Sequence, residues 1–249
     1  MIEQAKGLGH RVSLITNGIL LTEQVIRKLI DLKLDMLWVS LDGASPECYV
    51  DVRLGDALPT VIENLEQLQL QRYQTFGASN WAGYPKLGIA FVAMQRNIHD
   101  LGAVVRLGSR LGAVEFSISN VLAHNTELLH ENLYMHSMSM VVGQEIRPLV
   151  HMPLMDIQPR TIKALSDVQK DMNRLELSGS LLNQNTDQCP FIERGSLAVR
   201  WDGKVSPCLP LLYTHTHFLD DRERTSKEYF VGDIQETDLL HIWTNGDYK

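Results

Sequence analysis

The sequence predicts an α/β fold: a parallel sheet that forms a barrel or part of one, followed by a smaller module with a β-hairpin. Apolar runs alternate with long amphipathic stretches over about the first 120 residues, which is the pattern of parallel strands joined by crossover helices. The run from Met36 to Leu41 lacks polar alternation, as expected for a parallel strand covered on both faces. Further along, Asp202-Gly203 separates two short strand-like segments and is a strong hairpin signal.

The composition argues against several classes of protein. A net charge of −7 with no stripe of Lys and Arg disfavours a nucleic-acid binder that relies on phosphate attraction. No apolar stretch of about 18 residues is present, so no transmembrane helix is expected, and the first residues lack the apolar core of a signal peptide. Three cysteines, an odd number, do not form a disulfide framework. We therefore expect a cytoplasmic protein, without a membrane or nucleic-acid partner.

The elements of the first part are expected in the order βαβαβαβ. Thr22 is a good N-cap for a helix whose apolar side chains recur with a period of about 3.6 residues. A second helix is expected from about Leu58 to Tyr73, and a third begins after Asn97, which is expected to cap it. The strands between these helices are expected at residues 11–15, 36–41, 87–94 and 114–118.

Polar side chains end the second of these strands. Ser40 and Asp42 are two residues apart, so on a strand both point to the same face. Gly43 allows a turn, and Ser45 is a suitable N-cap for the helix that begins at Pro46. Because α/β folds bind ligands at the carboxyl ends of parallel strands, these residues are candidates for a binding site. The alternative is that Ser40 and Asp42 only stabilise the turn.

The organisation changes after residue 120. Residues 121–158 are rich in His and Met, and we interpret them as surface or pocket-lining residues rather than metal ligands; they could cover the mouth of a barrel. A helix is expected over residues 159–177, and a polar linker follows it. We therefore predict two domains, at residues 1–182 and 183–249.

The second module begins near Cys189 and contains the predicted hairpin. With a two-residue turn at Asp202-Gly203, Trp201 faces Lys204, and Cys208 lies at the open end of the hairpin, facing Leu197. The chain arrives at this point from Cys189. Two thiols brought together in a reducing compartment favour metal ligation over a disulfide.

Together these segments resemble the radical S-adenosylmethionine (SAM) enzymes that carry a SPASM domain. The resemblance rests on Thr16-Asn17-Gly18, on Ser40-Leu41-Asp42-Gly43 and on Arg53-Leu54-Gly55, in this order and at this spacing. It implies a partial (β/α)6 barrel, in which Thr16, Asn17, Ser40, Asp42 and Arg53 lie around SAM. An Arg suits the methionyl carboxylate, which it can bind through two parallel hydrogen bonds.

The hairpin carries the second half of the resemblance. Cys189, Gly203 and Cys208 follow the spacing that opens a SPASM domain, where such cysteines hold an auxiliary iron–sulfur cluster. The surrounding segment is most similar to maturases of tungsten-containing oxidoreductases. The resemblance implies a parent enzyme that takes electrons from a ferredoxin or flavodoxin and cleaves SAM to a 5′-deoxyadenosyl radical. That radical would modify a peptide, a protein or a cofactor.

The sequence also departs from this family. The three cysteines of the Cys-x3-Cys-x2-Cys motif, which hold the SAM-binding 4Fe-4S cluster, are absent, and the one remaining cysteine is Cys48. We expect Cys48 to be structural, and we interpret the chain as a fragment that lacks the cluster loop and the later SPASM cysteines. Accordingly we assign no catalytic side chain and expect no SAM cleavage by this chain alone.

Two alternatives stay open at this point. The first is a structural zinc site formed by Cys189, Cys208, His215 and His217, although their spacing is not a usual zinc pattern. The second is a non-catalytic α/β scaffold that has kept only its affinity for SAM.

Overall fold

The structure is a computed structural model in which two compact units are distinguished. The first unit comprises Met1–Val121 with Asn132–Ser180, and the second comprises Leu122–Glu131 with Leu181–Lys249. The short segment 122–131 follows the last long strand in the sequence but packs with the second unit. The residues described are 1–48, 56–77, 83–133, 149–151, 155–171, 195–219 and 222–244.

The first unit contains a five-stranded sheet with the order β1-β2-β3-β4-β5, in which every neighbouring pair is parallel. This sequential order is that of a barrel wall, whereas a doubly wound sheet reverses its order at a switch point. The predicted α/β class, with strands in a partial barrel, is thus confirmed. The strands are β1 (Ser13–Thr16), β2 (Met36–Ser40), β3 (Lys86–Ala93), β4 (Ala113–Asn120) and β5 (Leu149–His151).

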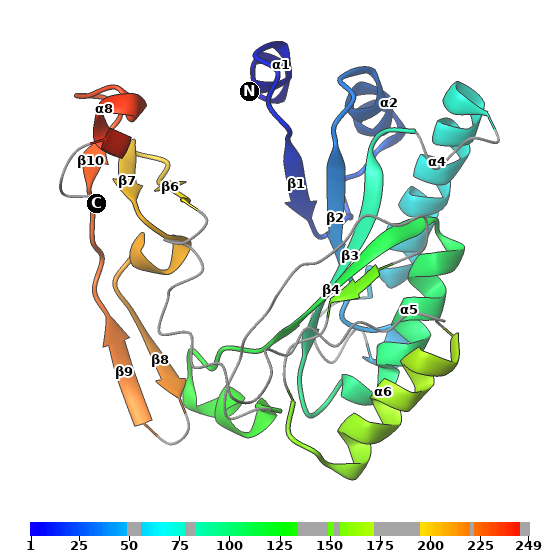
Figure 1. The fold of residues 1–249 in the computed structure, drawn as a ribbon. Helices are drawn as coiled ribbons and strands as arrows, with labels where there is room; N and C mark the ends of the chain where they lie inside the picture. Colours follow the sequence, from blue (N-terminus) through cyan, green and yellow to red (C-terminus); the bar gives the residue numbers. More distant parts are fainter. Residues whose placement is uncertain are drawn as a thin grey trace. The chain divides into compact units, whose positions relative to one another are not determined.

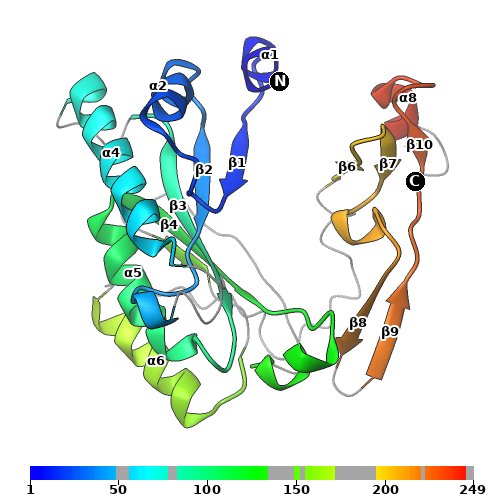
Figure 2. The same ribbon diagram turned by 180° about the vertical axis from the view of Figure 1, so that it is seen from behind.

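The helices α2, α4, α5 and α6 lie against one face of this sheet (Figures 1 and 2). Thr22 caps α2 as predicted, because its side chain accepts a hydrogen bond of 3.4 Å from the N–H of Val25. Among the residues that the structure describes, no helix combines the length and the hydrophobicity that a membrane span requires. The bounds are α1 (Ile2–Gly7), α2 (Glu23–Asp31), α4 (Leu58–Phe76), the 3-10 turn η2 (Ile98–Asp100), α5 (Leu101–Arg110) and α6 (Pro159–Asp171).

The core of the first unit lies between the sheet and these helices. Leu37, Val39 and Leu41 are fully buried in it, whereas the alternate residues Trp38 and Ser40 are half-buried. The expectation that this strand is covered on both faces holds fully for the face of Leu37 and Val39 and in part for the face of Trp38 and Ser40. Trp38 packs closely on Gly88 of β3, since a Cβ atom at Gly88 would lie 2.4 Å from the indole ring.

The second unit is built from short antiparallel strands around a small core. Val205, Val231 and Ile242 form this core. One sheet has the order β10-β7-β6, and a second consists of β8 and β9. The elements are η3 (Thr126–Glu131), β6 (Ala198–Val199), β7 (Lys204–Ser206), η4 (Leu209–Leu211), β8 (His215–Leu219), β9 (Arg222–Ser226), β10 (Gly232–Asp233) and α8 (Leu239–Thr244).

The hairpin β6–β7 exists as predicted, but its predicted register is wrong by one residue. Ala198 pairs with Ser206, so the loop holds three residues, 201–203, instead of two. The N–H of Gly203 bonds the carbonyl of Arg200 at 3.0 Å, and Gly203 has a φ of +91°. A tight turn followed by a glycine of positive φ is the usual three-residue hairpin loop. Trp201 is therefore 87% exposed in the loop and does not face Lys204.

Candidate functional site

The carboxyl ends of β1, β2 and β3 meet at one edge of the sheet, and Asp42 lies there immediately after β2. Its side chain is 3% exposed, and its Oδ1 accepts a hydrogen bond of 2.8 Å from the N–H of Val92 in β3. The predicted ligand-binding carboxylate thus also ties two neighbouring strands together. Ser40 is half-buried at the end of β2 and is in register with Ala90, a small residue on the next strand.

The loop that follows Asp42 leads into a helix as expected. The side chain of Ser45 caps the helix by accepting a hydrogen bond of 3.3 Å from the N–H of Cys48. Asp100, from the turn after β3, accepts a hydrogen bond of 2.5 Å from the N–H of Ala44. Cys48 is half-buried, and its sulfur lies 3.5 Å from Nε2 of His99. Arg53, the predicted partner of the SAM carboxylate, lies outside the described residues.

Thr16 and Asn17 end β1 and use their side chains locally. Thr16 Oγ1 accepts a hydrogen bond from the N–H of Gly18 at 3.2 Å, and Asn17 Oδ1 accepts one from the N–H of Ile19 at 3.1 Å. Thr16 is in register with Val39, whose side chain belongs to the helix-covered core. The structure therefore places Thr16 on the opposite face from Ser40, because residues in register share a face.

Cys208 has a defined place in the second unit. It precedes η4 in an extended conformation, and its carbonyl accepts hydrogen bonds from Ser206 Oγ at 3.1 Å and from the N–H of Leu211 at 3.2 Å. The Ser206 residue is fully buried, while the Cys208 thiol is free and half-buried. Its predicted partner Cys189 lies outside the described residues.

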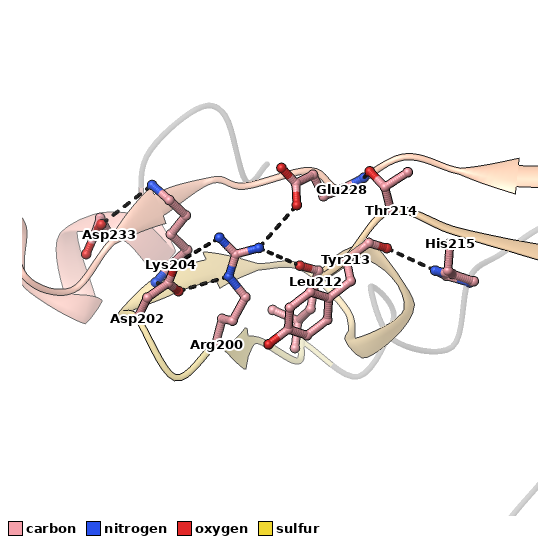
Figure 3. A network of polar contacts seen from close by, with 9 residues as sticks. All are labelled: Arg200, Asp202, Lys204, Leu212, Tyr213, Thr214, His215, Glu228 and Asp233. Atoms are coloured by element: carbon pink, nitrogen blue, oxygen red, sulfur yellow. Dashed lines mark hydrogen bonds and ion pairs between the residues drawn. The ribbon is translucent and has the colours of Figure 1, made fainter.

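Arg200 is the centre of a polar network beside the loop between β6 and β7 (Figure 3). This residue was not singled out from the sequence. Its guanidinium donates hydrogen bonds of 2.9 and 2.8 Å to Asp202, 3.0 Å to the carbonyl of Leu212 and 3.1 Å to Glu228. It also lies over the ring of Phe230, 4.5 Å from the centroid. The hydrogen bonds from Arg200 lower the pKa of Asp202 to about 2. Arg200 thereby joins the hairpin loop, the end of η4 and the segment after β9.

Comparisons with known proteins agree with this arrangement. Residues 189–249 match the SPASM iron–sulfur cluster-binding domain. The whole chain is 26% identical to the tungsten-containing aldehyde ferredoxin oxidoreductase cofactor-modifying protein of Pyrococcus furiosus, of which it covers 63%. It is also 26% identical over 80% of its length to a probable GTP 3′,8-cyclase of Methanococcus maripaludis, of which it covers 58%. The chain thus spans less than two thirds of the length of each of these two relatives.

A solved structure shares the fold. Streptococcus suis SuiB bound to S-adenosylmethionine superposes with a TM-score of 0.55 at 13% identity, over 98% of this chain and 50% of SuiB. The SPASM match covers residues 189–249, and the chain as a whole is similar to radical SAM proteins that carry such a domain. The resemblance predicted from the sequence is therefore confirmed.

Two cysteines of the matched segment suit an iron–sulfur cluster by their chemistry. Cys189 and Cys208 are the two cysteines within the matched SPASM segment, and thiolates are the ligands that such clusters require. A free, half-buried thiol held by backbone contacts suits Cys208 to this role. Two thiolates fill half of a four-thiolate set, so this chain fits the cluster in part.

The zinc alternative gains no support from its described members. No group of three or more His, Cys, Asp or Glu among the described residues could hold a metal ion, and this includes Cys208, His215 and His217. The two histidines instead form a cluster with His124, in which the ring centroids of His124 and His215, and of His215 and His217, are 5.5 Å apart. Burial, with smaller contributions from nearby positive groups, lowers the pKa of His217.

Proposed function

We propose that the chain is part of a radical SAM maturase that modifies a peptide, a protein or a cofactor. The observation that carries this proposal is the pairing, in one chain, of a parallel sheet with polar residues at its carboxyl edge and a SPASM segment that holds Cys208. The sheet edge would bind SAM, and the SPASM segment would contribute to an auxiliary iron–sulfur cluster.

The chain's own residues would orient the cofactors. Ser40 and Asp42 would line the SAM site, with Thr16 and Asn17 shaping the neighbouring loop and Arg53 binding the methionyl carboxylate. Cys189 and Cys208 would provide thiolates for the auxiliary cluster. In the parent enzyme, bound SAM and a reduced 4Fe-4S cluster would supply the radical chemistry, and the protein would contribute position and electrostatics.

The substrate class rests on the relatives. The Pyrococcus furiosus relative is described as modifying the cofactor of a tungsten-containing oxidoreductase, and SuiB has been solved with its precursor peptide SuiA. The sequence relationship favours a substrate connected with a tungsten-containing oxidoreductase for this chain. We further propose a ferredoxin or flavodoxin as the electron donor and the cytoplasm as the compartment, where thiols stay reduced.

The SAM site can be tested by calorimetry on the purified chain. SAM is titrated into the wild-type chain and into Ser40→Ala, Arg53→Gln and Arg27→Gln. We expect Arg53→Gln to bind SAM about tenfold more weakly, because it loses a charge-assisted carboxylate contact. Arg27 pairs with Glu23 on the exposed surface of α2, so Arg27→Gln is the matched control. Equal affinity in all four proteins, or no binding by the wild type, would refute the site.

The cluster assignment is tested separately. The chain is reconstituted anaerobically with iron and sulfide, and its visible absorbance and iron content are measured. We expect both signals to fall in Cys189→Ser and in Cys208→Ser and to persist in Cys48→Ser. Iron binding that is lost in Cys48→Ser but kept in Cys208→Ser would contradict the assignment.

A further inference from the structure

Asn97 is a buried residue whose side chain serves a different purpose from the one its position predicts. It lies at the N-cap of η2, yet its side chain makes no capping hydrogen bond. Instead its Nδ2 donates to the carbonyl of Asp42 at 3.2 Å and to the carbonyl of Val92 at 2.9 Å. Its Oδ1 accepts a hydrogen bond of 2.8 Å from the N–H of Met94. With 1% exposure, Asn97 thus connects the end of β3 to the loop after β2.

Asp100 makes a second connection between the same two segments. It is 9% exposed, and its Oδ2 accepts a hydrogen bond of 2.5 Å from the N–H of Ala44. The backbone of the loop 42–44 is therefore held at both ends by side chains of the turn after β3. Buried hydrogen bonds of this kind resist displacement, because breaking one leaves a polar group unpaired.

We propose that Asn97, supported by Asp100, is a positioning residue that sets the backbone of the loop 42–44 for SAM binding. This inference rests on the proposed function, since it takes the loop after β2 as part of the SAM site. Asn97 does not need to contact SAM. It acts through the loop, which it holds in one conformation before the ligand arrives, and a site prepared in this way binds without the cost of ordering.

The test compares Asn97→Asp with Val104→Ala. The aspartate has the same shape and keeps an acceptor for Met94, but it replaces the amide donor with an oxygen that faces two carbonyl groups. Val104 is a fully buried residue of α5, so Val104→Ala weakens the same unit by a cavity in its core. Hydrogen exchange of the peptide containing Gly43 and Ala44 reports on the loop, and calorimetry reports on SAM affinity.

We expect Asn97→Asp to accelerate exchange at Ala44 and to weaken SAM binding by about tenfold, whereas Val104→Ala changes neither at a temperature where it is folded. Unchanged exchange in Asn97→Asp would overturn the inference. So would faster exchange with unchanged affinity, or an equal loss of affinity in Val104→Ala. If the wild-type chain does not bind SAM, the proposed function fails. In that case the exchange data still decide whether Asn97 orders the loop.

Discussion

The Oδ1 atom of Asp42 accepts a hydrogen bond of 2.8 Å from the backbone N–H of Val92. A residue predicted to line a cofactor site is therefore also a link between two strands of the sheet. Its effects on stability and on binding can be separated by Asp42→Asn, because the amide keeps an acceptor oxygen but removes the negative charge.

We predict that Asp42→Ala destabilises the first unit by about 1–3 kcal/mol, since it leaves the N–H of Val92 without this acceptor. Asp42→Asn keeps an acceptor oxygen and should lose less stability. Urea unfolding measures both variants, with Asp31→Ala on the exposed end of α2 as the control, expected within about 0.5 kcal/mol of the wild type. Equal stability of Asp42→Ala and the control would show that the contact is unimportant.

Gly88 is predicted to be intolerant of a side chain. A Cβ atom there would lie 2.4 Å from the ring of Trp38 and 2.6 Å from the side chain of Met36, so Gly88→Ala should cost about 1–3 kcal/mol by overpacking. Trp38→Leu should relieve part of that cost in the double mutant. Gly7→Ala, whose Cβ would meet no atom within 4 Å, is the control. Equal melting temperatures of Gly88→Ala and Gly7→Ala would contradict the packing argument.

Removal of the Arg200 guanidinium is expected to loosen the second unit. Arg200→Ala loses four hydrogen bonds and the contact with Phe230, and Arg200→Lys keeps the charge without the planar fork. We expect the melting temperature to decrease from the wild type to Arg200→Lys and further to Arg200→Ala. Arg222→Ala on exposed β9 is the control and should melt like the wild type. A Lys variant as stable as the wild type would mean that charge alone is sufficient.

The Arg200–Asp202 pair also predicts an acid-labile contribution. Because the folded-state pKa of Asp202 is about 2, below the ordinary value of 3.8, folding is favoured above pH 4 by the ionised carboxylate. That contribution is lost as the pH falls from about 4 through about 2. Between these pH values, the free energy of unfolding should fall more steeply with decreasing pH for the wild type than for Asp202→Asn. Parallel curves would exclude the contribution.

His217 predicts a second pH dependence of stability, which arises from a neutral group in the folded state instead of a charged one. Its pKa is lowered below the ordinary value of 6.5, mainly by burial, so the neutral ring is favoured in the folded state. The unfolded chain then binds the proton more tightly, and stability should fall as the pH drops below about 6.5. His217→Gln should flatten this decline, whereas His241→Gln on exposed α8 should not. A decline that survives in His217→Gln would assign it to another group.

We finally predict that the chain alone produces no 5′-deoxyadenosine from SAM under reducing conditions. It contains three cysteines, of which two lie in the SPASM segment, so it cannot provide the three thiolates of the SAM-binding cluster. Chromatography of an anaerobic reaction with dithionite measures the product. Formation of 5′-deoxyadenosine by the wild-type chain, at a level above that of boiled protein, would refute this prediction.

Features that depend on neighbouring residues could be predicted from the amino-acid sequence. The Thr22 and Ser45 caps, the strand from Met36 to Ser40 and the hairpin around Gly203 were all predictable. Each of them follows from local chemistry, namely side-chain periodicity, capping oxygens and the freedom of glycine to adopt a positive φ. The order of strands and helices also identified the parallel sheet.

Features that depend on distant partners became visible in the folded chain alone. The hairpin register is shifted by one residue because a three-residue loop competes with a two-residue loop of nearly the same sequence signal. The three-residue strand β5 is too short to show a period. Asn97 resembles a helix cap in sequence, yet it bonds to Asp42, 55 residues away. Long-range hydrogen bonds of this kind, like those of Arg200, leave no periodic trace in the sequence because the chain brings their partners together only on folding.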